Sequence, residues 1–87
     1  MFKVNEEVAF REVDGQLVVV NLQTGFYHSL NETATFIFQL IRKDTGVPEI
    51  LRELCARYDL PEETARRDLE ECIESLVKEQ VLVEPRE

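Results

Sequence analysis

Two dipeptides typical of tight turns divide the first thirty residues of the chain. Of all the features of the sequence, they restrict most strongly the folds that the chain can adopt. Asp14-Gly15 and Thr24-Gly25 are both typical of tight turns, and both lie between apolar runs. Residues 7–13 alternate at period two, whereas residues 17–22 form a nearly continuous apolar run rich in valine. The pattern predicts a three-stranded antiparallel β-meander over residues 7–13, 17–22 and 26–30, with the central strand buried on both faces.

The rest of the chain predicts three helices. Asn31 is placed to cap a first helix that ends near Lys43, Gly46 breaks the chain, Pro48 fits the first turn of a second helix, and Pro61 opens a third. Apolar residues recur at helical spacing in all three segments. They are Ala34, Ile37, Phe38 and Ile41; Val47, Ile50, Leu51, Leu54, Cys55 and Tyr58; and Ala65, Leu69, Cys72, Ile73, Leu76 and Val77. Phe36 and Leu40 lie off the first stripe, which predicts a helix buried on more than one side.

The order of these elements predicts an α+β fold like a winged helix-turn-helix, with a three-stranded antiparallel β-meander followed by three α-helices. The apolar tail Val81-Leu82-Val83 is expected to pack back on the body as a short terminal strand. A chain of 87 residues is enough for a single domain, residues 1–87, with a thin core.

The charge of the chain restricts its partners. It carries 18 acidic and 10 basic residues, a net charge of −8. Nucleic-acid binding depends on Lys and Arg that neutralise phosphates, so this balance argues against a nucleic-acid partner and suits basic or neutral peptides. No segment is long and apolar enough to span a bilayer, and the first residues lack the apolar region of a signal peptide. We therefore expect a cytoplasmic protein that does not contact a membrane.

Few side chains could carry catalysis or hold a metal. Cys55 and Cys72 lie outside any CxxC pattern and on apolar helix stripes, where a free cysteine behaves as a small hydrophobe. His28 is the single histidine, and zinc normally takes four Cys, His or carboxylate ligands. No glycine-rich loop offers an oxyanion site or a phosphate cradle. The sequence therefore predicts no catalytic residue, no metal site and no cofactor, and the protein is not expected to be an enzyme.

Two features are not fully explained by a compact core. The apolar stripe of the third helix spans roughly 140°, wider than the ~100° that one packing surface takes. That helix either packs in a corner between two other helices or lines a groove with one edge of its stripe. The third strand, Phe26 to Leu30, ends the meander, and its open edge contains neither Pro nor Lys to block pairing with another chain.

One stretch carries a resemblance to a known family. Residues 24–31, Thr-Gly-Phe-Tyr-His-Ser-Leu-Asn, resemble the "TG-aromatic-aromatic-x-x-LN" segment of the PqqD-like family. The similarity continues through Ala34, Ile37, Phe38 and Leu40, then Tyr58-Asp59-Leu60-Pro61, and then Asp68, Leu69, Ile73, Leu76, Val81 and Leu82. It spans residues 7–84. The chain departs from the pattern at Ala34, where many relatives have Gly, and at Gln80, where a Gly usually precedes the final apolar pair. The second departure predicts that the left-handed helix cap favoured by glycine is lost.

The resemblance implies that the chain binds a peptide. Members of the family bind the leader segment of a ribosomally made precursor peptide as an added strand against the third strand, with leader side chains on the third helix. The peptide-binding residues expected on this basis are Phe26, Tyr27, His28, Ser29 and Leu30, with Asp68, Leu69, Cys72, Ser75 and Leu76. The helix residues assume that the groove follows the edge Asp68–Cys72–Ser75, with Leu69 and Leu76 as its floor. The alternative edge is Arg66–Ile73–Val77.

The resemblance also implies a pathway and partners. A chain of this length resembles two kinds of free-standing family member, the quinone-cofactor peptide chaperone and the recognition protein of lasso-peptide pathways. Its compact Thr-Gly-aromatic segment and short tail look more like the lasso-peptide group. Its expected partners are the precursor leader peptide, a cysteine leader peptidase and an ATP-dependent cyclase.

Two other functions would use the same elements. A winged-helix DNA-binding or regulatory protein would insert the third helix into the major groove, which requires several Lys or Arg. This segment offers Arg66, Arg67 and Lys78 against seven acidic residues between positions 62 and 79. The other alternative is an enzyme subunit or structural dimer that pairs through the open strand edge, which the oligomeric state in solution would reveal.

Overall fold

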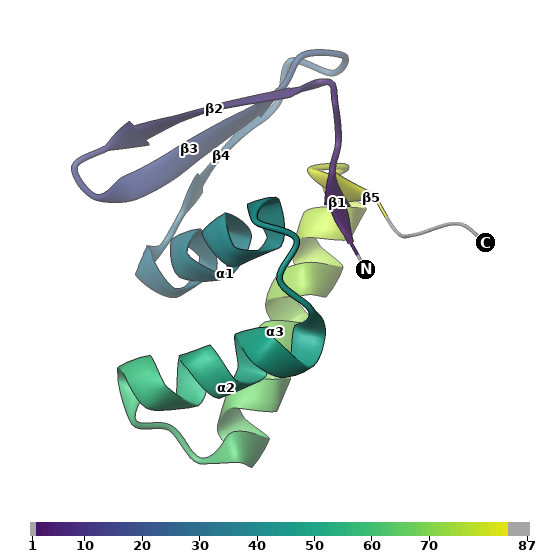
Figure 1. Cartoon of the computed structure of the whole chain (residues 1–87). Helices are drawn as coiled ribbons and strands as arrows, with labels where there is room; N and C mark the ends of the chain where they lie inside the picture. Colours follow the sequence, from purple (N-terminus) through teal and green to yellow (C-terminus); the bar gives the residue numbers. More distant parts are fainter. Residues whose placement is uncertain (1, 84–87) are drawn as a thin grey trace.

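The computed structural model describes residues 2–83 and contains five strands and three helices within them. The strands are β1 (Lys3–Val4), β2 (Val8–Val13), β3 (Gln16–Asn21), β4 (Tyr27–Leu30) and β5 (Leu82–Val83), and the helices are α1 (Glu32–Arg42), α2 (Val47–Tyr58) and α3 (Glu62–Lys78). Figure 1 shows the β2–β3–β4 sheet above α1, with α2 and α3 on the same side of the sheet. The predicted α+β fold, a meander followed by three helices, is confirmed.

The meander forms where the two turn dipeptides predict it. Asp14 and Gly15 both have positive φ, 53° and 80°, as a two-residue turn between twisted strands requires. This turn sets the register of β2 against β3, in which Val13 pairs with Gln16 and Phe10 with Val19. Gly25, at φ 81°, closes the second turn and aligns β4 antiparallel to β3.

Only one face of the sheet is covered. Leu17 and Val19 point toward the helices and are buried, whereas Val18 and Val20 point to the opposite face and are only half-buried. Within residues 2–83 no helix packs on that opposite face (Figure 1). The prediction that β3 is buried on both faces is therefore wrong. A β-branched run reports strand propensity, and it does not show whether a second layer is present.

The first helix lies at the centre of the domain. Asn31 caps it, since the side-chain oxygen accepts a 2.8 Å hydrogen bond from the Ala34 N–H. Ile37 and Phe38 are fully buried against the sheet, while Phe36 on another side meets the Tyr58 ring of α2 edge-on at 5.9 Å. Burial of α1 on more than one side is thus confirmed, and α1 forms the layer between the sheet and the other two helices.

The C-terminal end of α3 has the left-handed cap that the sequence predicts to be lost. Gln80 adopts a left-handed conformation, φ 64°, that is normally the role of a glycine. Its N–H donates to the Val77 carbonyl at 3.0 Å, and the next N–H, of Val81, donates to the Leu76 carbonyl at 2.9 Å. These two bonds form a Schellman motif, so the prediction of a lost cap is wrong. The motif tolerates a non-glycine residue at a cost of about 1–2 kcal/mol.

A second, small sheet joins the two ends of the chain. Strand β1 pairs antiparallel with β5, with Lys3 opposite Val83 and Val4 opposite Leu82. The side-chain amides of Asn5 and Asn21 both donate to the Gln80 carbonyl, at 2.8 and 3.3 Å. The apolar tail packs back on the body as predicted, because Val81 and Leu82 are each 1% exposed. Over residues 2–83, no helix has the length and apolar character needed to cross a membrane.

Candidate functional site

Strand β4 lies at an open edge of the three-stranded sheet. The strand order is β2–β3–β4, and no described residue pairs with the outer edge of β4. The Asn21 N–H donates to the Phe26 carbonyl at 2.8 Å, and hydrogen-bonded and non-hydrogen-bonded pairs alternate along an antiparallel ladder. The backbone groups of His28 and the N–H of Leu30 are therefore directed to β3, while the Leu30 carbonyl accepts a hydrogen bond from Thr35 Oγ1. Tyr27 and Ser29 direct theirs to the open edge, where two N–H donors and two carbonyls are available to another chain.

Helix α3 supplies a second wall opposite β4. Positions 68, 71, 72, 75 and 79 recur at three- and four-residue spacing, so they share one flank of the helix. A groove of about 500 Å³ lies between this flank, β4 and the start of α1. It is lined by His28, Ser29, Leu30, Asn31, Thr33, Ala34, Asp68, Glu71, Cys72, Ser75, Leu76 and Glu79.

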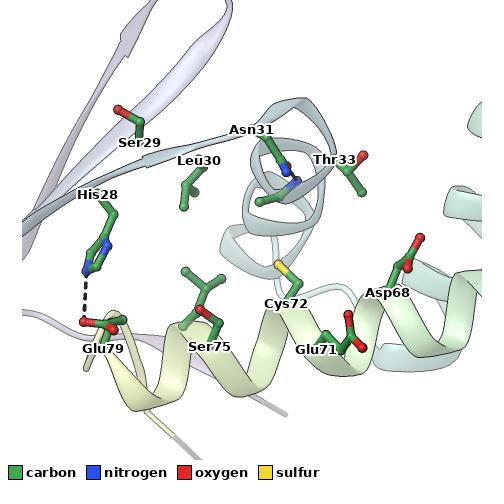
Figure 2. Close-up of a pocket in the computed structure, with 12 residues that line it drawn as sticks. His28, Ser29, Leu30, Asn31, Thr33, Asp68, Glu71, Cys72, Ser75 and Glu79 are labelled. Carbon is green, nitrogen blue, oxygen red and sulfur yellow. Dashed lines mark hydrogen bonds and ion pairs between the residues drawn. The ribbon is translucent and has the colours of Figure 1, made fainter.

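The groove has an apolar floor between polar ends. Figure 2 shows His28 and Leu30 pointing from β4 toward α3, whereas Ser29 points away, as alternation along a strand requires. Leu30 and Leu76 are 6% and 4% exposed and belong to the hydrophobic core as well as to the groove. Cys72 lies beside them, with its sulfur directed toward the start of α1 (Figure 2). The space above this floor can hold an apolar side chain.

The ends of the groove are acidic. Asp68 and Glu71 lie at one end and Glu79 at the other (Figure 2). His28 is the only basic side chain in the lining, and its Nε2 lies 3.1 Å from Glu79 Oε1. That nitrogen is shielded from solvent, and its contact with Glu79 does not have hydrogen-bond geometry. This contact links β4 to the last turn of α3 across the groove. The potential in the groove favours a basic ligand.

The cysteine in the groove is poorly suited to nucleophilic chemistry. Burial raises the pKa of the Cys72 thiol to about 11, because desolvation penalises the thiolate. A catalytic cysteine needs the opposite shift, toward a stable thiolate at neutral pH. Among residues 2–83, no group of three His, Cys, Asp or Glu side chains is placed to hold a metal ion.

The structure brings together seven of the ten predicted site residues. His28, Ser29, Leu30, Asp68, Cys72, Ser75 and Leu76 all line the groove. Leu69 does not line the groove, because it is 2% exposed and points into the core. Cys72, about one turn further along α3, is the first residue of the apolar stripe that lines the groove. Phe26 and Tyr27 do not line it either. They are 68% and 71% exposed, and Tyr27, which pairs with Val20, points to the opposite face of the sheet.

The structure adds five lining residues that the sequence-based prediction missed. They are Asn31, Thr33, Ala34, Glu71 and Glu79. The helical spacing that relates Asp68 to Cys72 and Ser75 also includes Glu71 and Glu79, so that spacing could have identified both. The other three residues are the N-cap of α1, Asn31, and two residues of its first turn, Thr33 and Ala34. Because α1 begins directly after β4, this turn closes one end of the groove.

Comparisons with known proteins agree with this geometry. Residues 16–82 match the family described as coenzyme PQQ synthesis protein D (PqqD). The chain belongs to the PqqD family. Its match begins at β3 and ends within β5, and it therefore includes both walls of the groove. No curated protein matches the chain.

Two solved structures share the fold over nearly the whole chain. One is described as TbiB1 in complex with the TbiA(beta) leader peptide. It has a TM-score of 0.91 and 27% sequence identity, and the alignment covers 98% of this chain and 99% of that one. The other is described as lasso peptide synthetase B1 complexed with the leader peptide. It has a TM-score of 0.89 and 23% identity, over 95% and 98% of the two chains. At that identity the second structure shows the fold alone.

Proposed function

We propose that this chain binds the leader segment of a ribosomally synthesised precursor peptide and delivers it to processing enzymes. The leader adds as a fourth strand against β4, and its alternate side chains enter the groove beside α3. The observation that carries the proposal is the open edge of β4, with backbone groups of Tyr27 and Ser29 directed outward, next to a groove with an apolar floor. Backbone bonds give affinity in such strand addition, and side-chain pockets give specificity.

The chemistry of the groove narrows the kind of leader. An apolar side chain suits the floor of Leu30, Cys72 and Leu76, and a basic side chain one or two strand positions away suits Asp68 and Glu71. The high pKa of the Cys72 thiol supports a binding role without chemistry on the peptide. The PqqD family and the leader-bound TbiB1 structure support the same function.

The second part of the proposal concerns the biosynthetic pathway in which the chain acts. Both structural neighbours are described with leader peptides, and one is described as a lasso peptide synthetase component. We infer a lasso-peptide pathway in which the partners are a leader peptidase and a cyclase. A short precursor gene beside genes for a transglutaminase-like peptidase and an asparagine-synthetase-like cyclase is the expected genomic setting.

The DNA-binding alternative gains no support from the geometry. The flank of α3 that borders the groove carries Asp68, Glu71 and Glu79, and Arg66 on another flank contacts Glu62 at 2.6 Å. A recognition helix with this charge would repel phosphates.

Hydrogen exchange on leader binding tests the proposed mode directly. The backbone N–H groups of His28 and Leu30 are already bonded to β3, so their exchange should change little. The N–H groups of Tyr27 and Ser29 should become protected when a synthetic leader binds, and the mass of the precursor should stay unchanged. Protection along β2 instead would refute the placement at β4. A change in precursor mass without other proteins would refute the non-catalytic role.

A further inference from the structure

Asn21 ends strand β3 and is the only polar residue in the buried core of residues 2–83. It is 2% exposed, and each of its polar atoms makes a hydrogen bond. A buried polar side chain is tolerated only when its hydrogen bonds are made, so the partners of such a residue indicate what it does. The bonds of Asn21 fall into two sets, one to the turn before β4 and one to the end of α3.

The first set of bonds holds the turn that leads into β4. The Asn21 side-chain oxygen accepts from the N–H groups of Gln23 and Thr24, at 2.9 and 3.3 Å, as an asparagine often does in a turn. The Asn21 N–H donates to the Phe26 carbonyl at 2.8 Å, and the Asn21 carbonyl accepts from the Gly25 N–H at 2.7 Å. These four bonds determine where β4 begins, and they therefore position the strand wall of the groove.

The second set is a single bond that reaches the end of α3. The Asn21 Nδ2 group donates to the Gln80 carbonyl at 3.3 Å. Gln80 directly follows Glu79, whose carboxylate lies 3.1 Å from His28 of β4 in the lining of the groove. One buried amide side chain therefore joins the strand wall to the helix wall beside this end of the groove.

We propose that Asn21 is a positioning residue for leader binding, which sets the separation of β4 and α3 at the His28–Glu79 end of the groove. This inference rests on the proposed leader-binding function. An added strand must bond to the open edge of β4 while its side chains enter the groove, so one separation of the two walls suits it. The contact between His28 and Glu79 lacks hydrogen-bond geometry and does not replace the Asn21 bond. A groove that is already held in its binding geometry binds more tightly, because less ordering accompanies binding.

Asn5 offers a matched control because its side chain makes the same kinds of bond elsewhere. Its side-chain oxygen accepts from the Glu7 N–H at 2.9 Å, also two residues along the chain, and its Nδ2 group donates to the same Gln80 carbonyl at 2.8 Å. Asn5 lies between β1 and β2, and none of its bonds within the described residues reaches β4. Loss of either amide removes one donor from one carbonyl, but only Asn21 connects that carbonyl to the strand wall.

The first experiment compares Asn21→Ser with Asn5→Ser. A serine hydroxyl still accepts from the N–H two residues later, but it is one bond shorter and does not reach Gln80. The probe is a fluorescent synthetic peptide of the leader from the neighbouring precursor gene, and fluorescence polarisation gives its Kd. Asn21→Ser should raise this Kd at least about fivefold, whereas Asn5→Ser should keep it within about twofold of wild type. Circular dichroism gives the melting temperature, which both substitutions should lower.

A second variant, Asn21→Asp, tests the same bond through pH. Its carboxylate still accepts from the N–H groups of the turn, but its second oxygen faces the Gln80 carbonyl, and two acceptors repel. Protonation converts that oxygen into a donor and restores the bond. The ratio of the Asn21→Asp Kd to the wild-type Kd should be at least about fivefold near neutral pH and should fall toward one at about pH 5. The titratable groups nearby, Glu7, His28 and Glu79, are present in both proteins, so the ratio isolates position 21.

A third measurement needs no leader. NMR relaxation dispersion of the free protein detects microsecond-to-millisecond motion, which Asn21→Ser should introduce in both β4 and the last turn of α3 and Asn5→Ser should not introduce in β4. If wild-type protein does not bind the leader, the proposed function fails, and this measurement still decides whether Asn21 joins the walls. Absence of such motion in Asn21→Ser would then overturn the inference.

The binding data can overturn the proposal in three ways. A leader Kd within about twofold of wild type for folded Asn21→Ser would do so. Equal increases in Kd for Asn21→Ser and Asn5→Ser would do so as well, because they would show that binding follows the general stability of the α3 end. If Asn21→Ser does not fold, a Kd ratio for Asn21→Asp that is independent of pH would overturn it instead.

Discussion

The two walls of the groove offer different chemistry to the same ligand. Strand β4 contributes backbone groups, since the N–H and C=O of Tyr27 and Ser29 are directed to the open edge. Helix α3 has its backbone bonds satisfied internally and contributes only side chains, among them Asp68, Cys72 and Ser75. Backbone bonding is nearly independent of the ligand sequence, whereas side-chain contacts depend on it.

This difference gives the two walls separate responses to mutation. Changes to the side chain of Ser29, which points away from the groove, should matter little unless they alter the backbone, whereas side-chain changes on α3 should alter affinity and selectivity.

The strand wall should fail when one outward donor is removed. Ser29→Pro removes an N–H that faces the open edge and leaves the bonds between β3 and β4 in place. Loss of the bond and local distortion should cost about 2 kcal/mol, roughly thirtyfold in the leader Kd measured by fluorescence polarisation.

Two control substitutions separate backbone from side chain at this wall. Ser29→Ala keeps the N–H and should change the Kd less than about twofold, a few tenths of a kcal/mol. His28→Pro removes an N–H that pairs with β3 and should instead lower the melting temperature. Equal loss of affinity in Ser29→Ala and a folded Ser29→Pro would show that the strand wall acts through its side chains.

The helix wall should respond to a single large side chain. Cys72→Arg fills the floor of the groove and should weaken leader binding at least about tenfold, about 1.4 kcal/mol, while the protein stays folded. Val77→Arg, on the opposite flank of α3, should act mainly on stability and lower the free energy of unfolding by about 1–3 kcal/mol. Urea unfolding and leader titration of both variants distinguish the flanks. The reverse outcome would assign the leader to the Ile73–Val77 flank.

The acidic rim should contribute a smaller, salt-dependent part of the affinity. Asp68→Asn removes a charge at one end of the groove, and pairing at such a partly exposed site is worth about 0–1 kcal/mol, or up to about fivefold in Kd. Glu74→Gln makes the same charge change on an exposed position that does not line the groove, and should have a smaller effect. The difference between the two variants should shrink as salt is raised. A leader with basic residues that binds Asp68→Asn as tightly as wild type at low salt would contradict an electrostatic role.

The proton on Cys72 has no effect at neutral pH, where the thiol is protonated in both the folded and the unfolded chain, and matters only at alkaline pH. Its pKa is about 11 in the folded chain against 9.0 for an ordinary cysteine, so between these values the unfolded chain loses the proton first. Folding then requires proton uptake, and the free energy of unfolding should fall as pH rises from about 9 toward 11. Cys72→Ala should lose this component of the pH dependence, measured against wild type by urea unfolding. Identical pH profiles for the two proteins would show that the helix wall is more hydrated than the structure indicates.

The local features of the fold were predictable from short-range chemistry. Asp14 and Gly15 determine a turn through their own backbone preferences, and Asn31 caps α1 through a bond three residues away. Strand β1 was missed because it has only two residues and pairs with β5 at the other end of the chain. Gln80 was misjudged because residue preference favours glycine, while two hydrogen bonds and the packing of Val81 hold the left-handed conformation.

The site was predictable in part for the same reason. Helical periodicity places Asp68, Cys72 and Ser75 on one flank, but it does not state which apolar residues of the stripe reach the groove. That depends on how α3 rotates against α1 and the sheet, which buries Leu69 and brings Leu76 to the floor. The open outer face of the sheet was likewise invisible in the sequence, because Val18 and Val20 resemble core residues.

Because the floor of the groove is also part of the hydrophobic core, leader binding and folding are thermodynamically coupled. Leu30 and Leu76 are core residues that the ligand also touches, so a bound peptide extends the core of a domain too small to have much of its own. A leader present at a hundredfold excess over its Kd should add about 2.7 kcal/mol to the free energy of unfolding. Evolution is constrained by the same overlap. Substitutions at the floor alter stability together with affinity, so new ligand preferences are expected to arise first at exposed rim positions such as Glu71 and Ser75.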